Sequence, residues 1–182
     1  MTIIQRQLVR INWDGPFTVE QVKNRDYVEA TEHGIYQIYG NHVIFGPNSL
    51  LYIGKAEDQS FSCRIGQHLD WLINFEGISI YLGTINDEDF AFEPEDDRWT
   101  EWRQLLRKVE SYTIWWHSPP CNSSNINTHS LQNTDTLHVQ NWGKIGRLSF
   151  EYSFPWAQFG NSTDTKRFPR IDEVEEVLNQ PK

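Results

Sequence analysis

A glutamate within a run of apolar residues is the first candidate for chemistry in this sequence. From Trp99 to His117, large apolar side chains recur at three- and four-residue steps, and Glu110 falls on or beside the stripe that should face the core. Carboxylates are seldom buried without a cationic partner or a metal ion. The pattern therefore leaves two interpretations of Glu110 open, a structural ion pair and a functional ligand.

A basic pair and two tyrosines are the other candidates. Arg64 and His68 lie four residues apart in a segment with helical periodicity, so they should project from one helix face and could contact a common anionic group. Tyr36 and Tyr52 occur in two β-rich segments. Taken singly, such a basic pair is typical of a helix surface, and such tyrosines are typical of a sheet or a core.

The order of these residues along the chain is more informative than any one of them. Gly34-Ile35-Tyr36 is followed by Tyr52-Ile53-Gly54, then by an arginine in the next helical segment, a helical glutamate and an asparagine after a proline. This order resembles the GIY-YIG nuclease family over about residues 30–125. Fifteen residues separate Tyr36 from Tyr52, a longer gap than is usual in the family, which predicts an extended hairpin loop around residues 41–49.

The resemblance implies an α+β (α/β) fold of the GIY-YIG type, with a small three-stranded sheet flanked by helices and, here, an additional C-terminal hairpin. Lys55 matches a lysine in the incision domain of bacterial excision-repair nucleases, and His68 is typical of the restriction-enzyme branch. Tyr52 and His68 would orient the attacking water or relay its proton, and Asn122 would hold the site's geometry. The residues implied to be catalytic are Tyr36, Tyr52, Lys55, Arg64, His68 and Asn122, and the implied metal ligand is Glu110.

Such residues suit the hydrolysis of a phosphodiester, which needs a deprotonated nucleophile and neutralisation of charge on the phosphoryl oxygens. One carboxylate such as Glu110 can hold Mg²⁺, with Mn²⁺ as a possible substitute, while the ion keeps several waters. Arg64 offers a planar fork to a phosphate oxygen. Tyr36 would accept the proton of the attacking water if the cations Lys55 and Arg64 favour its phenolate form.

Local sequence patterns predict the elements that must position these residues. Ser60 is a plausible N-cap, and Pro119-Pro120 must end the long helix that carries Glu110. The predicted elements are strands at 8–13, 34–40, 49–54 and 78–85, a turn at Asp14-Gly15-Pro16, helices at 18–23, 61–74, 99–117 and 170–178, a polar loop at 123–136 and a hairpin at 137–154.

Composition limits the class of protein. A chain of 182 residues with 38% hydrophobic content predicts one domain over residues 1–182, with the catalytic core at about 30–125. No segment approaches the roughly 18 uninterrupted apolar residues of a membrane helix, and no signal peptide is evident, so we expect a cytoplasmic protein without a membrane partner. Cys63 and Cys121 lack the spacing of a redox or zinc motif and are expected to be free thiols.

The net charge of −9 is unusual for a protein that binds nucleic acid, because such proteins generally present a basic face. Part of the imbalance is local, since residues 86–97 hold seven acids and no base, typical of a solvated loop or, alternatively, of an acidic lid. We therefore expect a nucleic-acid substrate, most simply DNA, with a homodimer or protein partner supplying affinity. Two alternatives stay open: a non-catalytic binding module of this fold, and a nuclease acting on RNA or branched DNA.

Overall fold

The computed structural model describes residues 7–25, 33–85, 98–126 and 137–153. The acidic segment 86–97, most of the polar loop after residue 126 and the predicted helix at 170–178 lie outside these ranges. The described elements, in chain order, are β1 (Gln7–Phe17), α1 (Val19–Lys23), β2 (Gly34–His42), β3 (Gly46–Ala56), α2 (Phe61–Gly66), α3 (Leu69–Leu72), β4 (Ser79–Ile85), α4 (Arg98–His117), β5 (Leu137–Gly143) and β6 (Glu151–Ser153).

The strands form one mixed sheet with the order β3-β2-β4-β1-β5-β6. Neighbouring strands are antiparallel except β1 and β5, which are parallel. The α+β class is therefore confirmed, but the predicted three-stranded sheet is too small. The three predicted strands correspond to β2, β3 and β4, which are adjacent, and β1, β5 and β6 extend the sheet beyond them. The parallel pairing of β1 with β5 joins residues 7–13 to residues 137–143, which are far apart in the sequence. Local sequence patterns therefore could not predict it.

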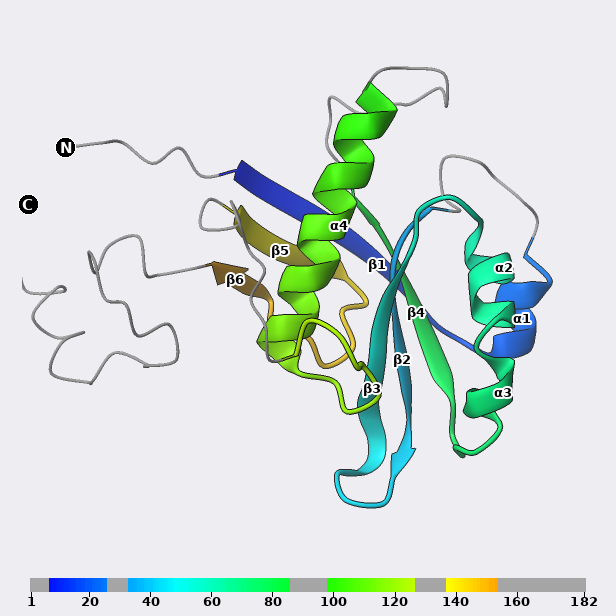
Figure 1. Ribbon diagram of the computed structural model, residues 1–182. Helices are drawn as coiled ribbons and strands as arrows, with labels where there is room; N and C mark the ends of the chain where they lie inside the picture. The colour runs from blue at the N-terminus through cyan, green and yellow to red at the C-terminus, as the bar shows by residue number, and fades with distance from the viewer. Residues whose placement is uncertain (1–6, 26–32, 86–97, 127–136, 154–182) are drawn as a thin grey trace, which may run out of the picture.

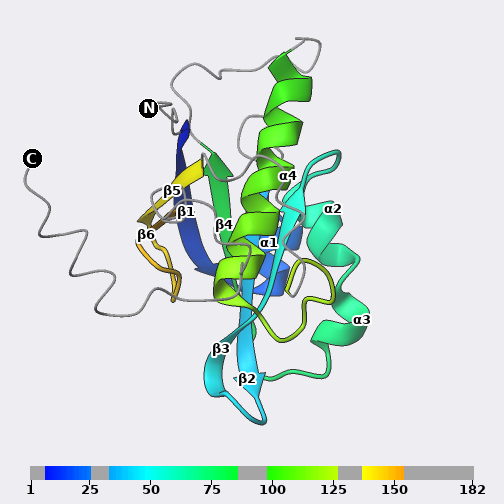
Figure 2. The same cartoon turned by 60° about the vertical axis from the view of Figure 1, so that its left-hand side comes forward.

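The helices cover the two faces of the sheet separately (Figures 1 and 2). On one face, α4 packs on a core that includes Ile35 and Ile53, and on the other face α1, α2 and α3 enclose a core that includes Tyr36 and Phe61. Successive residues of a strand point to opposite faces, which places Ile35 and Tyr36 in different cores. Because β3 is an edge strand, side chains from both faces can meet along its outer edge.

The first strand is longer than predicted. The sequence predicted a strand at 8–13 that ends in a turn at Asp14-Gly15-Pro16, but β1 continues through these residues to Phe17. Its pairing with β4 shifts register between Asp14 and Phe17, so an irregularity within the strand takes the place of the turn. A Cβ at Gly15 would lie 2.8 Å from the carbonyl oxygen of Ile80, so the glycine allows the close approach of β4.

The helix predicted at 61–74 is divided in two. Ser60 caps α2 through its side chain, as predicted, but α2 ends at Gly66 and α3 starts at Leu69. His68 is the N-cap of α3 rather than a residue in mid-helix. By contrast, α4 agrees with the helix predicted at 99–117 to within one residue. None of the helices in the described ranges has the length and apolar composition required to cross a membrane.

Candidate active site

The two motif tyrosines lie on adjacent strands and face the same side of the sheet. Tyr36 on β2 and Tyr52 on β3 have nearly parallel rings, with centroids 6.1 Å apart and an interplanar angle of 27°. The Tyr36 phenol passes over Gly54, where a Cβ would overlap the Tyr36 hydroxyl and lie 2.7 Å from Cε1 of Tyr52. The glycine that ends Tyr52-Ile53-Gly54 therefore admits the Tyr36 side chain to this position.

His68 binds the hydroxyl group of Tyr36 directly. Its Nε2 lies 2.7 Å from Tyr36 Oη, and its ring centroid lies 5.0 Å from that of Tyr52. His68 is the N-cap of α3 and follows the end of α2 by two residues. Burial, reinforced by the charge of Arg64, lowers the pKa of His68 to about 4, so the imidazole is neutral at physiological pH.

Arg64 on α2 supplies a positive charge beside the tyrosines. Its Nη1 donates a hydrogen bond to Oε1 of Gln67 over 2.8 Å. Its Nε is buried and has no hydrogen-bond partner among the residues that the structure describes. Because an unpaired buried donor is costly, this N–H is a ready site for an anionic oxygen.

The protonation of the tyrosines differs from the sequence-based expectation. Burial raises the pKa of Tyr36 far above its ordinary value, and the Tyr52 hydroxyl raises it further, while Arg64 lowers it by less. The pKa of Tyr52 is also raised, first by burial and then by the charge of Glu110. The expectation that Lys55 and Arg64 make Tyr36 a phenolate is therefore wrong for the protein alone, because desolvation outweighs the nearby cations.

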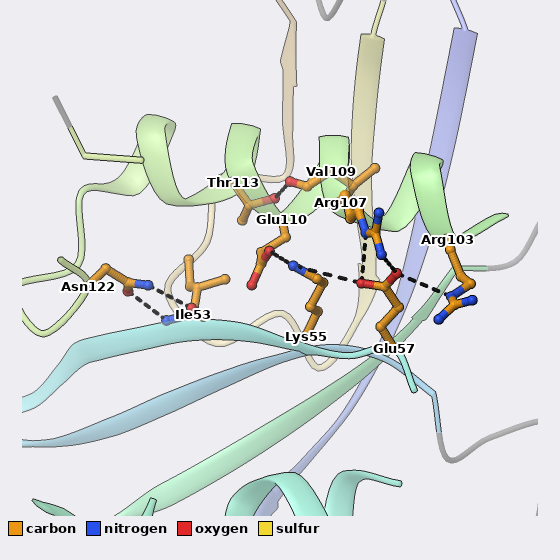
Figure 3. Close-up of polar contacts among 9 residues, drawn as sticks. All are labelled: Ile53, Lys55, Glu57, Arg103, Arg107, Val109, Glu110, Thr113 and Asn122. Atoms are coloured by element: carbon orange, nitrogen blue, oxygen red, sulfur yellow. Dashed lines mark hydrogen bonds and ion pairs between the residues drawn. The ribbon is translucent and has the colours of Figure 1, made fainter. Parts of the chain in front are cut away.

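Glu110 and Lys55 form an ion pair on the other side of β3 (Figure 3). Lys55 Nζ lies 2.6 Å from Oε2 of Glu110, whose side chain is only 12% exposed. Burial raises the pKa of Glu110, while Lys55 acts in the opposite direction. Of the two interpretations of Glu110 that the sequence left open, the structure shows the ion pair, and its cation is itself one of the candidate site residues.

Glu57 is a buried carboxylate that the sequence analysis missed. Its side chain is 8% exposed and lies 4.0 Å from Lys55 Nζ. Two arginines of α4 converge on it: Arg107 Nε donates to Oε2 over 3.0 Å and Arg103 Nε to Oε1 over 3.3 Å. Lys55 thus lies between two carboxylates, as Figure 3 shows. Lys55 and Glu57 are two residues apart at the end of β3, and Arg103 and Arg107 are four residues apart in α4, so each pair projects from one face. This spacing is a signal that could have revealed the cluster.

Asn122 binds the outer edge of β3 as a neighbouring strand would. Its Oδ1 accepts a hydrogen bond from Ile53 N over 3.0 Å, and its Nδ2 donates to Ile53 O over 2.8 Å (Figure 3). The backbone N–H of Cys121 adds a bond of 2.9 Å to Leu51 O. The segment after α4 is therefore fixed beside the residue that follows Tyr52, in agreement with a geometric role for Asn122.

Cys63 and Cys121 are both free thiols.

All seven candidate residues lie around β3, but in two groups. The first group lies on the face of the sheet that α2 and α3 cover, and it consists of Tyr36, Tyr52, Arg64 and His68. The second group, Lys55 and Glu110, lies on the face that α4 covers. Asn122 holds the edge between them. The groups interact electrostatically, because the charge of Arg64 lowers the pKa of Glu110 and the charge of Glu110 raises the pKa of both tyrosines.

The described residues limit the kind of metal site that this part of the chain could form. Within the described ranges, no three His, Cys, Asp or Glu residues come together as metal ligands. That excludes a site made entirely of such side chains from this part of the chain. It suits Mg²⁺ held by one carboxylate, since this ion keeps several waters and binds phosphate oxygens of the substrate. In Glu110, Oε2 contacts Lys55, and Oε1 has no hydrogen-bond partner among the described residues.

Comparison with known proteins identifies no family. No family model matches the chain, and neither a curated protein nor a solved structure matches it. The function must therefore be inferred from the residues around β3 and their geometry.

Proposed function

We propose that this protein is a divalent-metal-dependent endonuclease of the GIY-YIG type that hydrolyses phosphodiester bonds, with DNA as its substrate. The observation that carries the proposal is the grouping of Tyr36, His68 and Arg64 at the edge strand whose other side holds Glu110. Each residue type was expected from the motif order, and together they offer a phenol, an anion-binding N–H and a carboxylate beside one strand.

Each residue has a chemical task in this proposal. Arg64 Nε, which has no hydrogen-bond partner among the described residues, would donate to a non-bridging phosphate oxygen. Mg²⁺ held by Glu110 would supply positive charge that stabilises the phosphoryl oxygens and lowers the pKa of a nearby water or phenol. Tyr36 would lose its own proton to solvent, and the phenolate would then accept a proton from the attacking water. Tyr52, stacked on Tyr36, would orient that water.

In the proposed active site, Lys55 and the metal ion would both bind Glu110. At 2.6 Å its ammonium group occupies one carboxylate oxygen and leaves Oε1 for a cation. Glu57, 4.0 Å away, offers Lys55 an alternative partner when the charge around Glu110 changes. Lys55 would then be close enough to the edge of β3 to contribute positive charge beside the substrate phosphate.

One observation favours a second candidate, a non-catalytic binding module of the same fold. Glu110 already has a close cationic partner in Lys55, and an ion pair of this kind would persist in a domain without catalytic activity. The net charge of −9 also fits a protein that acts through a protein partner. The two candidates differ in one respect that can be measured, the release of cleaved nucleic acid.

The test is a cleavage assay with matched variants. Wild type, Glu110→Gln and the control Glu151→Gln, whose side chain is 53% exposed on β6, are incubated with supercoiled plasmid, linear duplex, single-stranded DNA and RNA in Mg²⁺, Mn²⁺ or EDTA. We expect metal-dependent DNA cleavage by wild type and Glu151→Gln, and a loss of orders of magnitude in Glu110→Gln. Cleavage of RNA alone would change the substrate class. Absence of cleavage in every condition would overturn the proposal and favour the binding module. Equal cleavage by wild type and Glu110→Gln would overturn the proposed role of Glu110 as the metal ligand.

A further inference from the structure

Trp71, one residue before the end of α3, contacts the side of His68 that faces away from Tyr36. Its indole Nε1 lies 3.1 Å from His68 Nδ1. The indole ring is half-buried and also packs near Tyr52 and Phe75, each with a centroid distance of 5.8 Å. His68 is therefore held at both ring nitrogens, by Trp71 at Nδ1 and by Tyr36 at Nε2.

These two contacts determine where the imidazole proton resides. An indole N–H can only donate a hydrogen bond, so His68 Nδ1 must be the acceptor and cannot carry a proton. A neutral imidazole then carries its single proton on Nε2. Since Nε2 lies 2.7 Å from Tyr36 Oη, the N–H of His68 donates to the tyrosine oxygen.

We propose that Trp71 is a positioning residue that fixes the Nε2–H tautomer of His68, so that His68 donates a hydrogen bond to the oxygen of Tyr36. The effect of Trp71 on catalysis rests on the proposed function, but the tautomer of His68 does not. A donor at Tyr36 Oη stabilises the phenolate that the nuclease chemistry requires. It also means that His68 does not accept the proton of Tyr36, which would pass to solvent instead.

The surroundings of His68 maintain this tautomer across neutral pH. A second proton on Nδ1 would place an N–H of the imidazolium against the N–H of Trp71, which is repulsive. Burial and the positive charge of Arg64 act in the same direction and disfavour the imidazolium. The other tautomer, with its proton on Nδ1, would lose the hydrogen bond from Trp71 and leave a half-buried indole N–H unpaired.

The direct test is the tautomer of His68 measured by long-range ¹H–¹⁵N correlation in the full chain at neutral pH. Wild type should show a protonated Nε2 and an unprotonated Nδ1. Two variants remove the indole N–H: Trp71→Phe, and Trp71 replaced by 3-benzothienylalanine, which keeps the bicyclic shape with sulfur in place of N–H. Both should show a population with the proton on Nδ1. The control is Trp142→Phe, because Trp142 on β5 is 47% exposed and outside the site; it should keep the wild-type pattern.

Kinetics then separates this inference from the proposed function. If the protein is a nuclease, both Trp71 variants should lower kcat by roughly 10- to 100-fold, the range seen when a residue that orients a functional histidine is removed, with little change in KM. A proton on Nδ1 in wild type, or a tautomer unchanged in both variants, would overturn the inference even if the protein cleaves DNA. A tautomer that shifts as expected in a protein without nuclease activity would support the role of Trp71 and refute the proposed function.

Discussion

At the scale of single residues, the arrangement of Lys55 between Glu110 and Glu57 changes what a substitution of Glu110 should do. The two distances are 2.6 Å to Glu110 and 4.0 Å to Glu57, so the lysine has a nearer and a farther carboxylate. From sequence alone, Glu110 was either part of a structural ion pair or a functional ligand. The structure shows a charge cluster, in which the loss of one carboxylate leaves another within reach of Lys55.

We predict that Glu110→Gln lowers the free energy of unfolding by about 1–2 kcal/mol in EDTA, less than the ~3–5 kcal/mol typical when a buried charge loses its only partner. The smaller cost is expected because Lys55 can turn toward Glu57. Urea denaturation of wild type, Glu110→Gln and the exposed control Glu151→Gln measures it, and the control should stay within ~0.5 kcal/mol of wild type. A loss of ~3–5 kcal/mol, or a gain in stability, would show that Glu57 does not take over as the partner of Lys55.

Sequence patterns found the residue types of the site but not all of their contacts. The residues that the motif order singled out lie around β3, because they fall on or next to β2, β3, α2 and α4, which are adjacent in the fold. It could not reveal that Tyr36 is protonated, since its pKa depends on burial, which only the packing of α2 and α3 produces. Trp71 was also missed, although it lies three residues after His68, the N-cap of α3, so that their contact is a local one.

At the scale of elements, the edge of β3 is the place where the fold and the site depend on each other. Asn122 pairs with both backbone groups of Ile53, so the segment after α4 acts as a short additional partner for the edge strand. Because α4 also carries Glu110, this contact helps to fix the carboxylate relative to the strand that carries Tyr52. An edge covered in this way is also protected from pairing with another chain.

We predict that Asn122→Ala lowers the free energy of unfolding by about 2–3 kcal/mol, because it removes two hydrogen bonds and leaves buried backbone groups of Ile53 unpaired. Chemical denaturation gives the value, and Asn12→Ala, at an exposed position of β1, is the control expected to change stability by less than ~0.5 kcal/mol. If Asn122→Ala were as mild as the control, the two hydrogen bonds would not hold the edge of β3.

Local patterns predicted the strong elements and missed the irregular ones. The long helix α4 was predicted almost to its ends, since its apolar period and the following Pro119-Pro120 are local signals. The division between α2 and α3 was not, because apolar spacing continues across the break and hides it. The strand β1 was cut short at Gly15-Pro16 for the opposite reason: a turn signal is present, but tertiary pairing with β4 overrides it.

At the scale of the whole molecule, the sheet presents a long uncharged hairpin at one end. Residues 34–54 contain no Lys, Arg, Asp or Glu. The extended loop predicted around 41–49 is wrong, because β2 runs to His42 and β3 starts at Gly46, so longer strands take up these residues and the loop is short. At its tip Val43, Ile44 and Phe45 are 98%, 79% and 63% exposed. Neither this hairpin nor the net charge of −9 provides the cationic surface on which strong binding to a phosphate backbone depends.

We therefore predict that the isolated protein binds random duplex DNA weakly, with a Kd of about 10⁻⁴–10⁻⁶ M at physiological salt. The reason is that few Lys and Arg side chains are available to displace counterions from DNA. Fluorescence anisotropy with a labelled duplex, measured in Ca²⁺ over a series of salt concentrations, tests this value. Nanomolar affinity of the monomer that persists at high salt would contradict it, whereas tighter binding on dimerisation would agree with a partner that supplies affinity.

The central claim, that Tyr36 takes part in phosphodiester hydrolysis, is tested most directly by the cleavage rate of Tyr36→Phe in Mg²⁺. The substitution keeps the ring that packs against Phe61 and removes only the oxygen that accepts the hydrogen bond from His68. We predict that cleavage falls by roughly 10²- to 10⁴-fold, the usual contribution of a general base, while Tyr81→Phe on β4 cleaves like wild type. Cleavage by Tyr36→Phe at the wild-type rate would contradict the account.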